Sequence, residues 1–287
     1  IGDGVNDVPA LKEADCSISF ASANEAARNI SRIVLMDSNF KSLPKVVEEG
    51  RSVIGNMEKV SALYVMKNLF VMFFTLFYAI MGLVTKDTYY PFDTKRMLLI
   101  EFFVLGIPIF ILALQPNKKR CDGNFLKNIL KSAFPAGLSI IAGVGFILLL
   151  FAFKDMSYIG GVNEVRQYTA SIAAIVLTLA GFSALFIVSL PFNRFRLIVI
   201  FTMLIVTVLG VWLDGSFFDG LFLNISYPLP RDIIYIVLGV IIATAVNIFG
   251  RRVAAKIADK IEALYLSRKK LPSMALTAGT LAEKSNH

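Results

Sequence analysis

Hydrophobic and polar positions divide the chain into a mixed first fifth and a long remainder dominated by apolar runs. Six such runs follow residue 60, and each approaches the roughly 20 residues that a helix needs to cross the hydrocarbon core of a bilayer. The predicted spans are residues 61–84, 97–115, 132–153, 168–190, 196–213 and 232–250. The pattern therefore predicts a mostly α-helical polytopic membrane protein with six transmembrane helices.

The first 60 residues follow a different pattern. Two short runs rich in β-formers, CSISF and SRIVLMD, enclose the helical segment SANEAARNI. The order loop, helix, strand, helix, strand is typical of an α/β domain with a parallel sheet. About 60 residues bury too little surface to fold well alone. We therefore expect residues 1–41 to be the C-terminal remnant of a larger α/β domain, whose N-terminal part lies outside this chain.

A helical pattern begins near Ser42 and enters the first apolar run without a stop signal. We predict one long helix from about residue 42 to residue 84. Residues 42–60 would form a stalk between the α/β remnant and the membrane domain, which we place at 61–250. Such a helix could act as a mechanical strut.

Charge adds an orientation to this picture. The chain is 56% hydrophobic with a formal net charge of +8, whereas soluble domains are about 45–50% apolar. The positive residues gather at the ends of apolar runs, which argues against a nucleic-acid partner. They are concentrated in the segments 116–131, 191–196 and 251–287. By the positive-inside rule the N-terminal domain and the C-terminal tail then both lie in the cytoplasm. We expect the membrane to be the plasma membrane of the cell.

The basic tail, residues 251–287, begins with RRVAAKIADKIEALYLSRKK. This segment has the pattern of an amphipathic helix that lies on anionic membrane lipid. A solvated flank that merely stops transfer into the membrane remains the alternative.

Candidate chemistry lies in the opening segment, IGDGVNDVPALKEAD. Gly2 and Gly4 allow a tight turn beside a ligand. Asp3 and Asp7 offer the carboxylate oxygens that suit Mg²⁺, and Asn6 can donate to a phosphoryl oxygen without adding negative charge. These features indicate metal-assisted phosphoryl transfer. An ordinary Asp/Gly/Asn turn is the alternative.

Three strings carry a resemblance to a known family: GDGVNDVPALKEAD, FASANEAARNISRIVLMDSNFKSL and VEEGRSVIGNMEKV. Together they resemble the end of the HAD-like phosphorylation domain of P-type ATPases and the stalk that follows it. The resemblance implies that Asp3 binds Mg²⁺, that Asn6 and Asp7 complete the phosphate site, and that ATP is the second cofactor. The nucleotide domain and the phosphorylated aspartate of that family are absent from this chain, so we do not expect the chain alone to hydrolyse ATP.

The first two spans also resemble the fifth and sixth helices of these pumps. In YVMKNLF, Asn68 stands where calcium pumps have a cation ligand, and in EFFVLGIPIFILALQPN a Gly–x–Pro step follows Glu101. An intramembrane carboxylate is expensive and usually functional. We expect at most one site for a hard cation, formed by Asn68, Glu101 and a helix outside this chain. Lys67 either reaches the membrane surface or acts as a counter-charge to Glu101.

These inferences predict a fragment of an ATP-driven P-type cation pump, most simply one that exports Ca²⁺. A pump for protons or for another monovalent or divalent cation is the alternative within the class. A passive channel or carrier subunit with a non-catalytic appendage is the alternative outside it. The expected partners are the transported cation, membrane lipid and the missing N-terminal part of the polypeptide.

Overall fold

A computed structural model describes residues 1–86, 89–115, 124–191, 193–217, 223, 225–226 and 228–284, with the side chains of Phe217 and of residues 261–284 left out of the description. The chain forms two compact units. The first contains Ile1–Asn56 and Gln115, and the second contains Met57–Leu114 and the described residues from Asn124 onward. Each unit is described by itself below.

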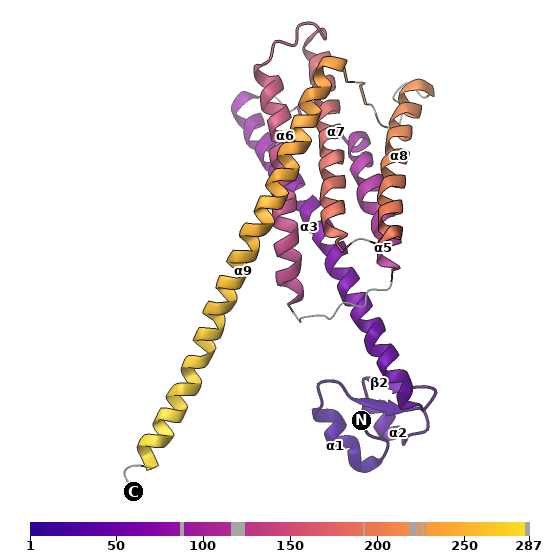
Figure 1. Ribbon diagram of the computed structural model, residues 1–287, viewed down its shortest axis with the longest axis vertical. Coiled ribbons are helices and arrows are strands. Elements are labelled where there is room, and N and C mark those ends of the chain that lie inside the picture. Colours follow the sequence, from indigo (N-terminus) through magenta and orange to yellow (C-terminus); the bar gives the residue numbers. More distant parts are fainter. Residues whose placement is uncertain are drawn as a thin grey trace. The chain divides into compact units, whose positions relative to one another are not determined.

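The first unit is a small α/β unit. Its elements are η1 (Val5–Asp7), α1 (Val8–Glu13), β1 (Ile18–Phe20), α2 (Glu25–Ile30), β2 (Ile33–Leu35) and η2 (Phe40–Ser42) (Figure 1). The two strands are parallel, with Ile18 beside Ile33. Parallel neighbours need a crossover, and α2 supplies it. Leu11, Ala27 and Leu35 are buried and form the small core of this unit.

The chain passes from the first unit to the second inside one helix, α3 (Leu43–Thr85). Pro44 stands in its first turn, where the missing N–H costs no hydrogen bond. No further proline interrupts the helix before residue 85. The structure thus confirms the single continuous helix predicted from residue 42 to residue 84.

The second unit is helical. It contains α4 (Thr94–Leu98), η3 (Leu99–Gly106), α5 (Ile107–Ala113), α6 (Phe125–Phe153), α7 (Val162–Val188), α8 (Arg194–Phe217), η4 (Pro230–Asp232) and α9 (Ile233–Lys284). Within the described residues, six helices or helix runs are long and apolar enough to cross a membrane, and each contains or overlaps one of the predicted spans. The protein is therefore a mostly helical polytopic membrane protein, as predicted.

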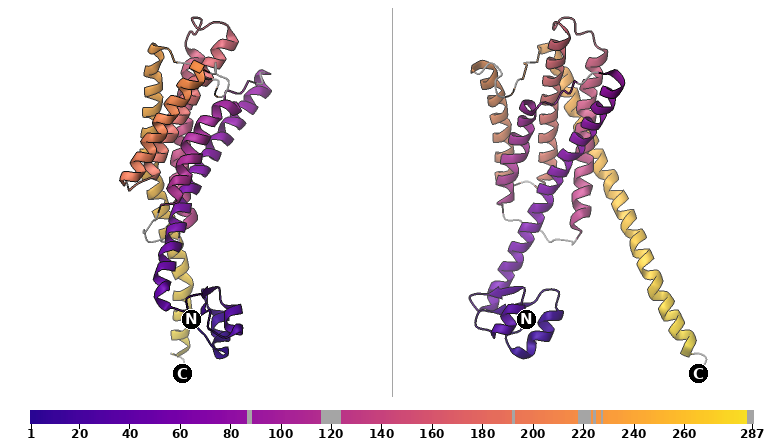
Figure 2. Two further views of the ribbon diagram at one scale, coloured as in Figure 1. Left: turned by 90° about the vertical axis from the view of Figure 1, so that its right-hand side faces the viewer. Right: turned by 180° about the vertical axis from the view of Figure 1, so that it is seen from behind.

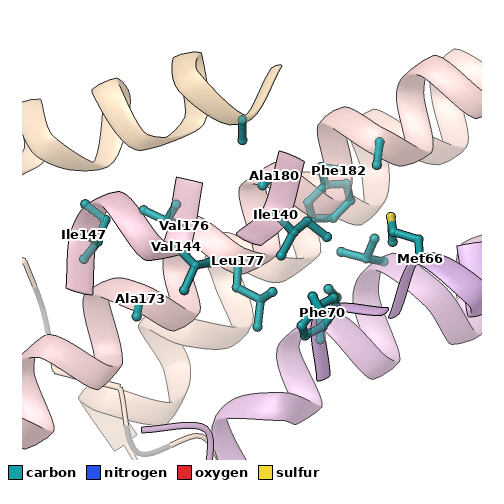
Figure 3. Packing of buried hydrophobic residues seen from close by; sticks show 14 of the residues in the cluster. Met66, Phe70, Ile140, Val144, Ile147, Ala173, Val176, Leu177, Ala180 and Phe182 are labelled. Atoms are coloured by element: carbon teal, nitrogen blue, oxygen red, sulfur yellow. The ribbon is translucent and has the colours of Figure 1, made fainter. Parts of the chain in front are cut away.

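The core of the second unit lies along α6 and α7, with buried residues of α3, η3 and α9 packed against them. Of these helices, α6, α7 and α9 run side by side (Figures 1 and 2). Ile140 and Val144 of α6 and Val176 and Leu177 of α7 are fully buried there (Figure 3). Helices in lipid gain little from hydrophobic burial, so close packing has to hold them together. Small residues provide it: a Cβ at Gly143 of α6 would lie only 2.7 Å from the Gly239 oxygen of α9.

Candidate functional site

The opening loop is folded around one carboxylate. Oδ2 of Asp7 accepts hydrogen bonds from the backbone N–H of Asp3 at 3.0 Å and of Gly4 at 3.1 Å. The Gly4 bond, followed by the Asp3 bond, lowers the pKa of the Asp7 carboxyl below its ordinary value. Asp7 therefore stays ionised at neutral pH and holds two successive N–H groups in a fixed direction.

Two further backbone bonds fix this loop to its surroundings. The N–H of Gly2 donates to the carbonyl of Ile18 at 3.2 Å, and the N–H of Asn24 donates to the carbonyl of Asp3 at 2.9 Å. The loop is thereby tied to β1 on one side and to the start of α2 on the other. Pro9 follows in α1, where it helps to start the helix.

The two glycines of the loop have different roles. A Cβ at Gly2 would lie 2.8 Å from the Asp7 Cγ and closer still to its Cβ, so no larger residue fits while Asp7 keeps its position. A Cβ at Gly4 would lie 3.7 Å from the Asp7 Oδ2, which is an ordinary contact. The side chain of Asp7 thus requires glycine at position 2, whereas the loop itself does not require it at position 4.

The donor set of the loop fits Mg²⁺ in part. The side chains of Asp3 and Asn6 are exposed and form no hydrogen bond with the described residues, so both can reach a ligand. Within the described residues no group of three or more His, Cys, Asp or Glu side chains gathers as a metal site. Mg²⁺ commonly takes one or two protein carboxylates and fills its remaining positions with water and phosphate. Asp3, with Asp7 behind it, suits that mode of binding.

In the membrane unit the structure brings together two of the three predicted cation-site residues. Nζ of Lys67, on α3, forms an ion pair with Oε1 of Glu101, on η3. Their side chains are 23% and 34% exposed. Asn68 is exposed and forms no hydrogen bond with the described residues. Lys67 thus points to the Glu101 carboxylate. Of the two alternatives left open by the sequence, this is the one in which Lys67 acts as a counter-charge.

Glu101 lies in an unusual stretch of backbone. η3 is a π-helix of eight residues, and at its end the N–H of Ile107 donates to the carbonyl of Phe102, five residues back. Pro108 follows directly and cannot donate to the preceding turn. A Cβ at Gly106 would lie 3.0 Å from the backbone carbonyl oxygen of Glu101, so the wide turn also depends on a glycine. Such π-helical segments are frequent at functional sites.

The stalk part of α3 is fixed by side-chain hydrogen bonds within each unit. In the first unit Asn56 Nδ2 donates to the carbonyl of Gln115, the residue that follows the α5 turn, at 2.7 Å. In the second unit Asn128 Nδ2, in the first turn of α6, donates to Glu58 Oε1 at 3.1 Å. The same stretch of α3 therefore contacts the chain near the ends of two other membrane helices.

A buried polar cluster at the opposite ends of α6, α7 and α9 was not predicted from the sequence. Asp232 is 0% exposed. It accepts hydrogen bonds from Lys154 Nζ at 2.7 Å and from the Tyr168 hydroxyl at 2.8 Å. Burial alone would lower the pKa of Lys154, but its bonds to Asp232 and Tyr158 outweigh this and raise it. The cluster joins three helices, and its sequence signal is a charged residue at the end of each of two apolar runs.

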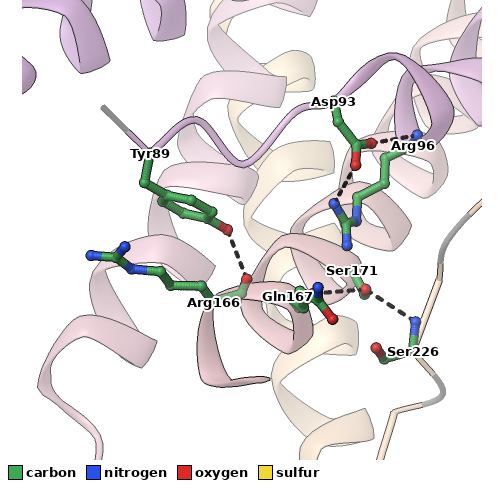
Figure 4. Close-up of polar contacts among 7 residues, drawn as sticks. All are labelled: Tyr89, Asp93, Arg96, Arg166, Gln167, Ser171 and Ser226. Atoms are coloured by element: carbon green, nitrogen blue, oxygen red, sulfur yellow. Dashed lines mark hydrogen bonds and ion pairs between the residues drawn. The ribbon is translucent and has the colours of Figure 1, made fainter. Parts of the chain in front are cut away.

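A second polar cluster was also missed, and Figure 4 shows it. Asp93 accepts from the backbone N–H of Arg96 at 2.9 Å and pairs with the Arg96 guanidinium at 2.7 Å, which caps the first turn of α4. Nearby, the N–H of Ser226 donates to Ser171 Oγ at 3.0 Å. The Asp93–Arg96 contacts are local to the start of α4, whereas the Ser226–Ser171 bond connects the segment before α9 to α7.

Comparison with known proteins gives consistent matches. No protein-family profile matches the chain. The calcium-transporting ATPase CtpE of Mycolicibacterium smegmatis is 35% identical over 205 residues, which cover 69% of this chain and 25% of that protein. The probable cation-transporting ATPase exp7 of Streptococcus pneumoniae is 29% identical over 219 residues, covering 75% and 26%. The human potassium-transporting ATPase alpha chain 2 is 41% identical over 113 residues, covering 39% and 10%.

The fold and these matches together define the class of the protein. The fold is that of a polytopic helical membrane protein joined to a small α/β unit through one continuous helix. The matches show that the chain belongs to the P-type cation-transporting ATPases, which confirms the resemblance found in the sequence. The chain spans about a quarter of the length of the first two relatives described above.

Proposed function

We propose that this chain is part of a pump that hydrolyses ATP with Mg²⁺ and uses the resulting aspartyl phosphate to move a hard cation across the cell membrane. In this proposal Asp3 binds Mg²⁺, while Asn6 and the N–H groups oriented by Asp7 face the phosphate, and Gly2 and Gly4 shape the loop. The phosphorylated aspartate and the nucleotide site come from the part of the polypeptide outside this chain. Both ends of the chain lie in the cytoplasm.

We propose Ca²⁺ as the transported cation. Two considerations support it: relatives over most of the chain are named for calcium transport, and the site offers oxygen ligands, which hard cations prefer. Glu101 supplies a carboxylate, and the π-helical turn around it supplies carbonyl oxygens. Ca²⁺ takes about six to eight oxygens, so the remaining ligands come from Asn68 and from helices outside this chain.

The Lys67–Glu101 ion pair is the observation that carries the proposed cation site. A carboxylate paired with an ammonium group is neutralised and cannot at the same time compensate the charge of a bound cation. The pair must therefore open when the cation binds, so that Lys67 and the cation compete for Glu101. Return of Lys67 to Glu101 would then help to expel the cation.

The same pair also favours one alternative within the class. A built-in lysine leaves room for a single monovalent cation or a proton at Glu101, and one relative over a shorter stretch is named for potassium transport. A passive channel is a weaker candidate, because its appendage would not need the loop ordered by Asp7.

The test uses the full-length protein in sealed vesicles and compares Glu101→Gln with Lys67→Met. We expect Glu101→Gln to lower the apparent Ca²⁺ affinity of both uptake and phosphoenzyme formation by on the order of tenfold. This is the loss expected when one interaction with a charged ligand group is removed. Lys67→Met removes the competitor and should raise the affinity. Asp155→Asn, an exposed carboxylate outside the spans, is the matched control.

Two outcomes would contradict the assignment. Normal Ca²⁺ affinity of both uptake and phosphoenzyme in Glu101→Gln would remove Glu101 from the cation site. Proton movement that depends on Glu101 but not on Ca²⁺ would favour the alternative pump.

A further inference from the structure

A buried polar pair lies on α9 where its apolar run ends. Asn247 is 0% exposed, and its Oδ1 accepts a hydrogen bond from Arg251 Nε at 3.1 Å. Two further donor atoms of the pair, Asn247 Nδ2 and Arg251 Nη2, are buried and have no hydrogen-bond partner among the described residues. Because the amide and the guanidinium are in contact, these two unused donors lie close together on one face of the helix.

The charge of Arg251 is not compensated locally. Arg251 forms no ion pair with the described residues, and neither α6 nor residues 233–258 of α9 contain an Asp or Glu. A buried charge without a partner is strongly unfavourable, much more so than an unpaired amide. Because Arg251 Nη2 is buried and unpaired, this end of the guanidinium favours an acceptor that carries negative charge.

The surroundings of the pair point to the surface of the membrane. Gly250 packs on α6, where an added Cβ would lie 3.0 Å from the Pro135 Cβ. The apolar run of α9 ends at Gly250, and Arg252 and Lys256 follow with exposed side chains. Arg251 thus lies at the depth where lipid headgroups meet the hydrocarbon, and its side chain is only partly covered.

A hydrogen-bond acceptor from the chain itself would not compensate the charge of Arg251. Pro135 has no N–H, so the carbonyl of Lys131, one turn earlier in α6, loses its usual donor. That carbonyl is neutral, however, and leaves the charge of Arg251 without compensation.

We propose that Asn247 and Arg251 bind the phosphate of an anionic phospholipid at the interface between α6 and α9. A phosphate offers several charged acceptors, which match the planar guanidinium and the adjacent amide. Basic pockets between membrane helices are known to hold such headgroups. This inference depends only on the chain spanning a membrane, not on the transported cation.

The experiment measures how many lipids the purified full-length protein retains, using native mass spectrometry during titration with phosphatidylglycerol or phosphatidylcholine. Arg251→Gln is compared with Arg252→Gln, which removes the same charge from the neighbouring exposed position. We expect one phosphatidylglycerol to bind on the order of fiftyfold more weakly to Arg251→Gln than to the wild type. Arg252→Gln should change the affinity by about fivefold or less.

Several outcomes would overturn the proposal. The first is an equal affinity for phosphatidylglycerol in the wild type and Arg251→Gln. The second is equal retention of phosphatidylcholine and phosphatidylglycerol by the wild type. The third is full competition by millimolar inorganic phosphate, which would indicate a site for a soluble anion. Arg251→Lys keeps the charge and guards against a folding defect in Arg251→Gln. We expect an intermediate affinity for Arg251→Lys, and wild-type affinity would contradict the role of the planar donors.

Discussion

At the scale of single residues, the opening loop depends on a contact between Gly2 and Asp7. Asp7 uses one oxygen to hold the N–H groups of Asp3 and Gly4, and its side chain fills the space where a Cβ at position 2 would be. Of the two glycines in the opening loop, Gly2 is therefore required, because a larger residue there would overlap the Asp7 side chain. Asp3 remains exposed, so its carboxylate is accessible to the proposed Mg²⁺.

This difference between the glycines predicts the effect of two alanine substitutions. Gly2→Ala should displace Asp7, because overpacking at a tight contact costs about 1–3 kcal/mol. Gly4→Ala meets only an ordinary contact and should leave the loop intact. Hydrogen–deuterium exchange of the peptide that covers residues 1–11 measures the result.

We expect exchange of this peptide to accelerate by on the order of tenfold or more in Gly2→Ala, with Gly4→Ala close to the wild type. Similar exchange in both variants would show that Asp7 does not depend on the space at position 2.

At the scale of helices, packing in the membrane unit rests on close approach rather than on large side chains. α6 and α9 meet at Gly143 and Gly239, and an added Cβ at Gly143 would also lie 2.9 Å from the Ala243 Cβ. Two turns away on the same interface, Gly250 meets Pro135. The interface that positions Asn247 and Arg251 is thus built from small residues.

A pair of glycines on α6 tests this packing. Gly143→Ala has to push against the backbone of α9 and should lower the thermal unfolding temperature of the purified full-length protein, at a cost of about 1–3 kcal/mol. Gly145→Ala is the control, because nothing lies within 4 Å of the added Cβ. It should be neutral or slightly stabilising, since alanine favours the helix by up to about 1 kcal/mol. Equal unfolding temperatures in the two variants would contradict the close contact.

The helices were predictable from the sequence, whereas several of their contacts were not. Apolar runs locate the part of a helix that crosses hydrocarbon, so residues 132–153 were predicted for a helix that begins at Phe125. The ion pair of Lys67 and Glu101 was one of two alternatives that the sequence left open for Lys67, because both charges stand in apolar runs. The pair of Lys154 and Asp232 was not predicted, because the two residues are 78 positions apart and meet only through the packing of α6 on α9. The Gly–x–Pro step indicated a weakened helix, but not its π-helical hydrogen bonds.

At the scale of the whole molecule, α3 is the connection that the proposed pump requires. One helix carries residues of the α/β unit at its start and Lys67, the partner of Glu101, in its membrane part. Its stalk also holds the hydrogen bonds to Gln115 and Asn128. In the proposed pump, a change in the opening loop can affect the proposed cation site through this chain segment only if the helix remains continuous.

Gly50 offers a direct test of that continuity, because it lies inside α3 with nothing within 4 Å of an added Cβ. Gly50→Ala should strengthen the helix and preserve coupling. Gly50→Pro removes a backbone hydrogen bond and kinks or breaks the helix, at a cost of about 3 kcal/mol. In sealed vesicles we expect Gly50→Pro to lower the number of cations moved per ATP hydrolysed, because force on the stalk would be lost at the break. An unchanged ratio in Gly50→Pro relative to Gly50→Ala would show that coupling follows a route other than α3.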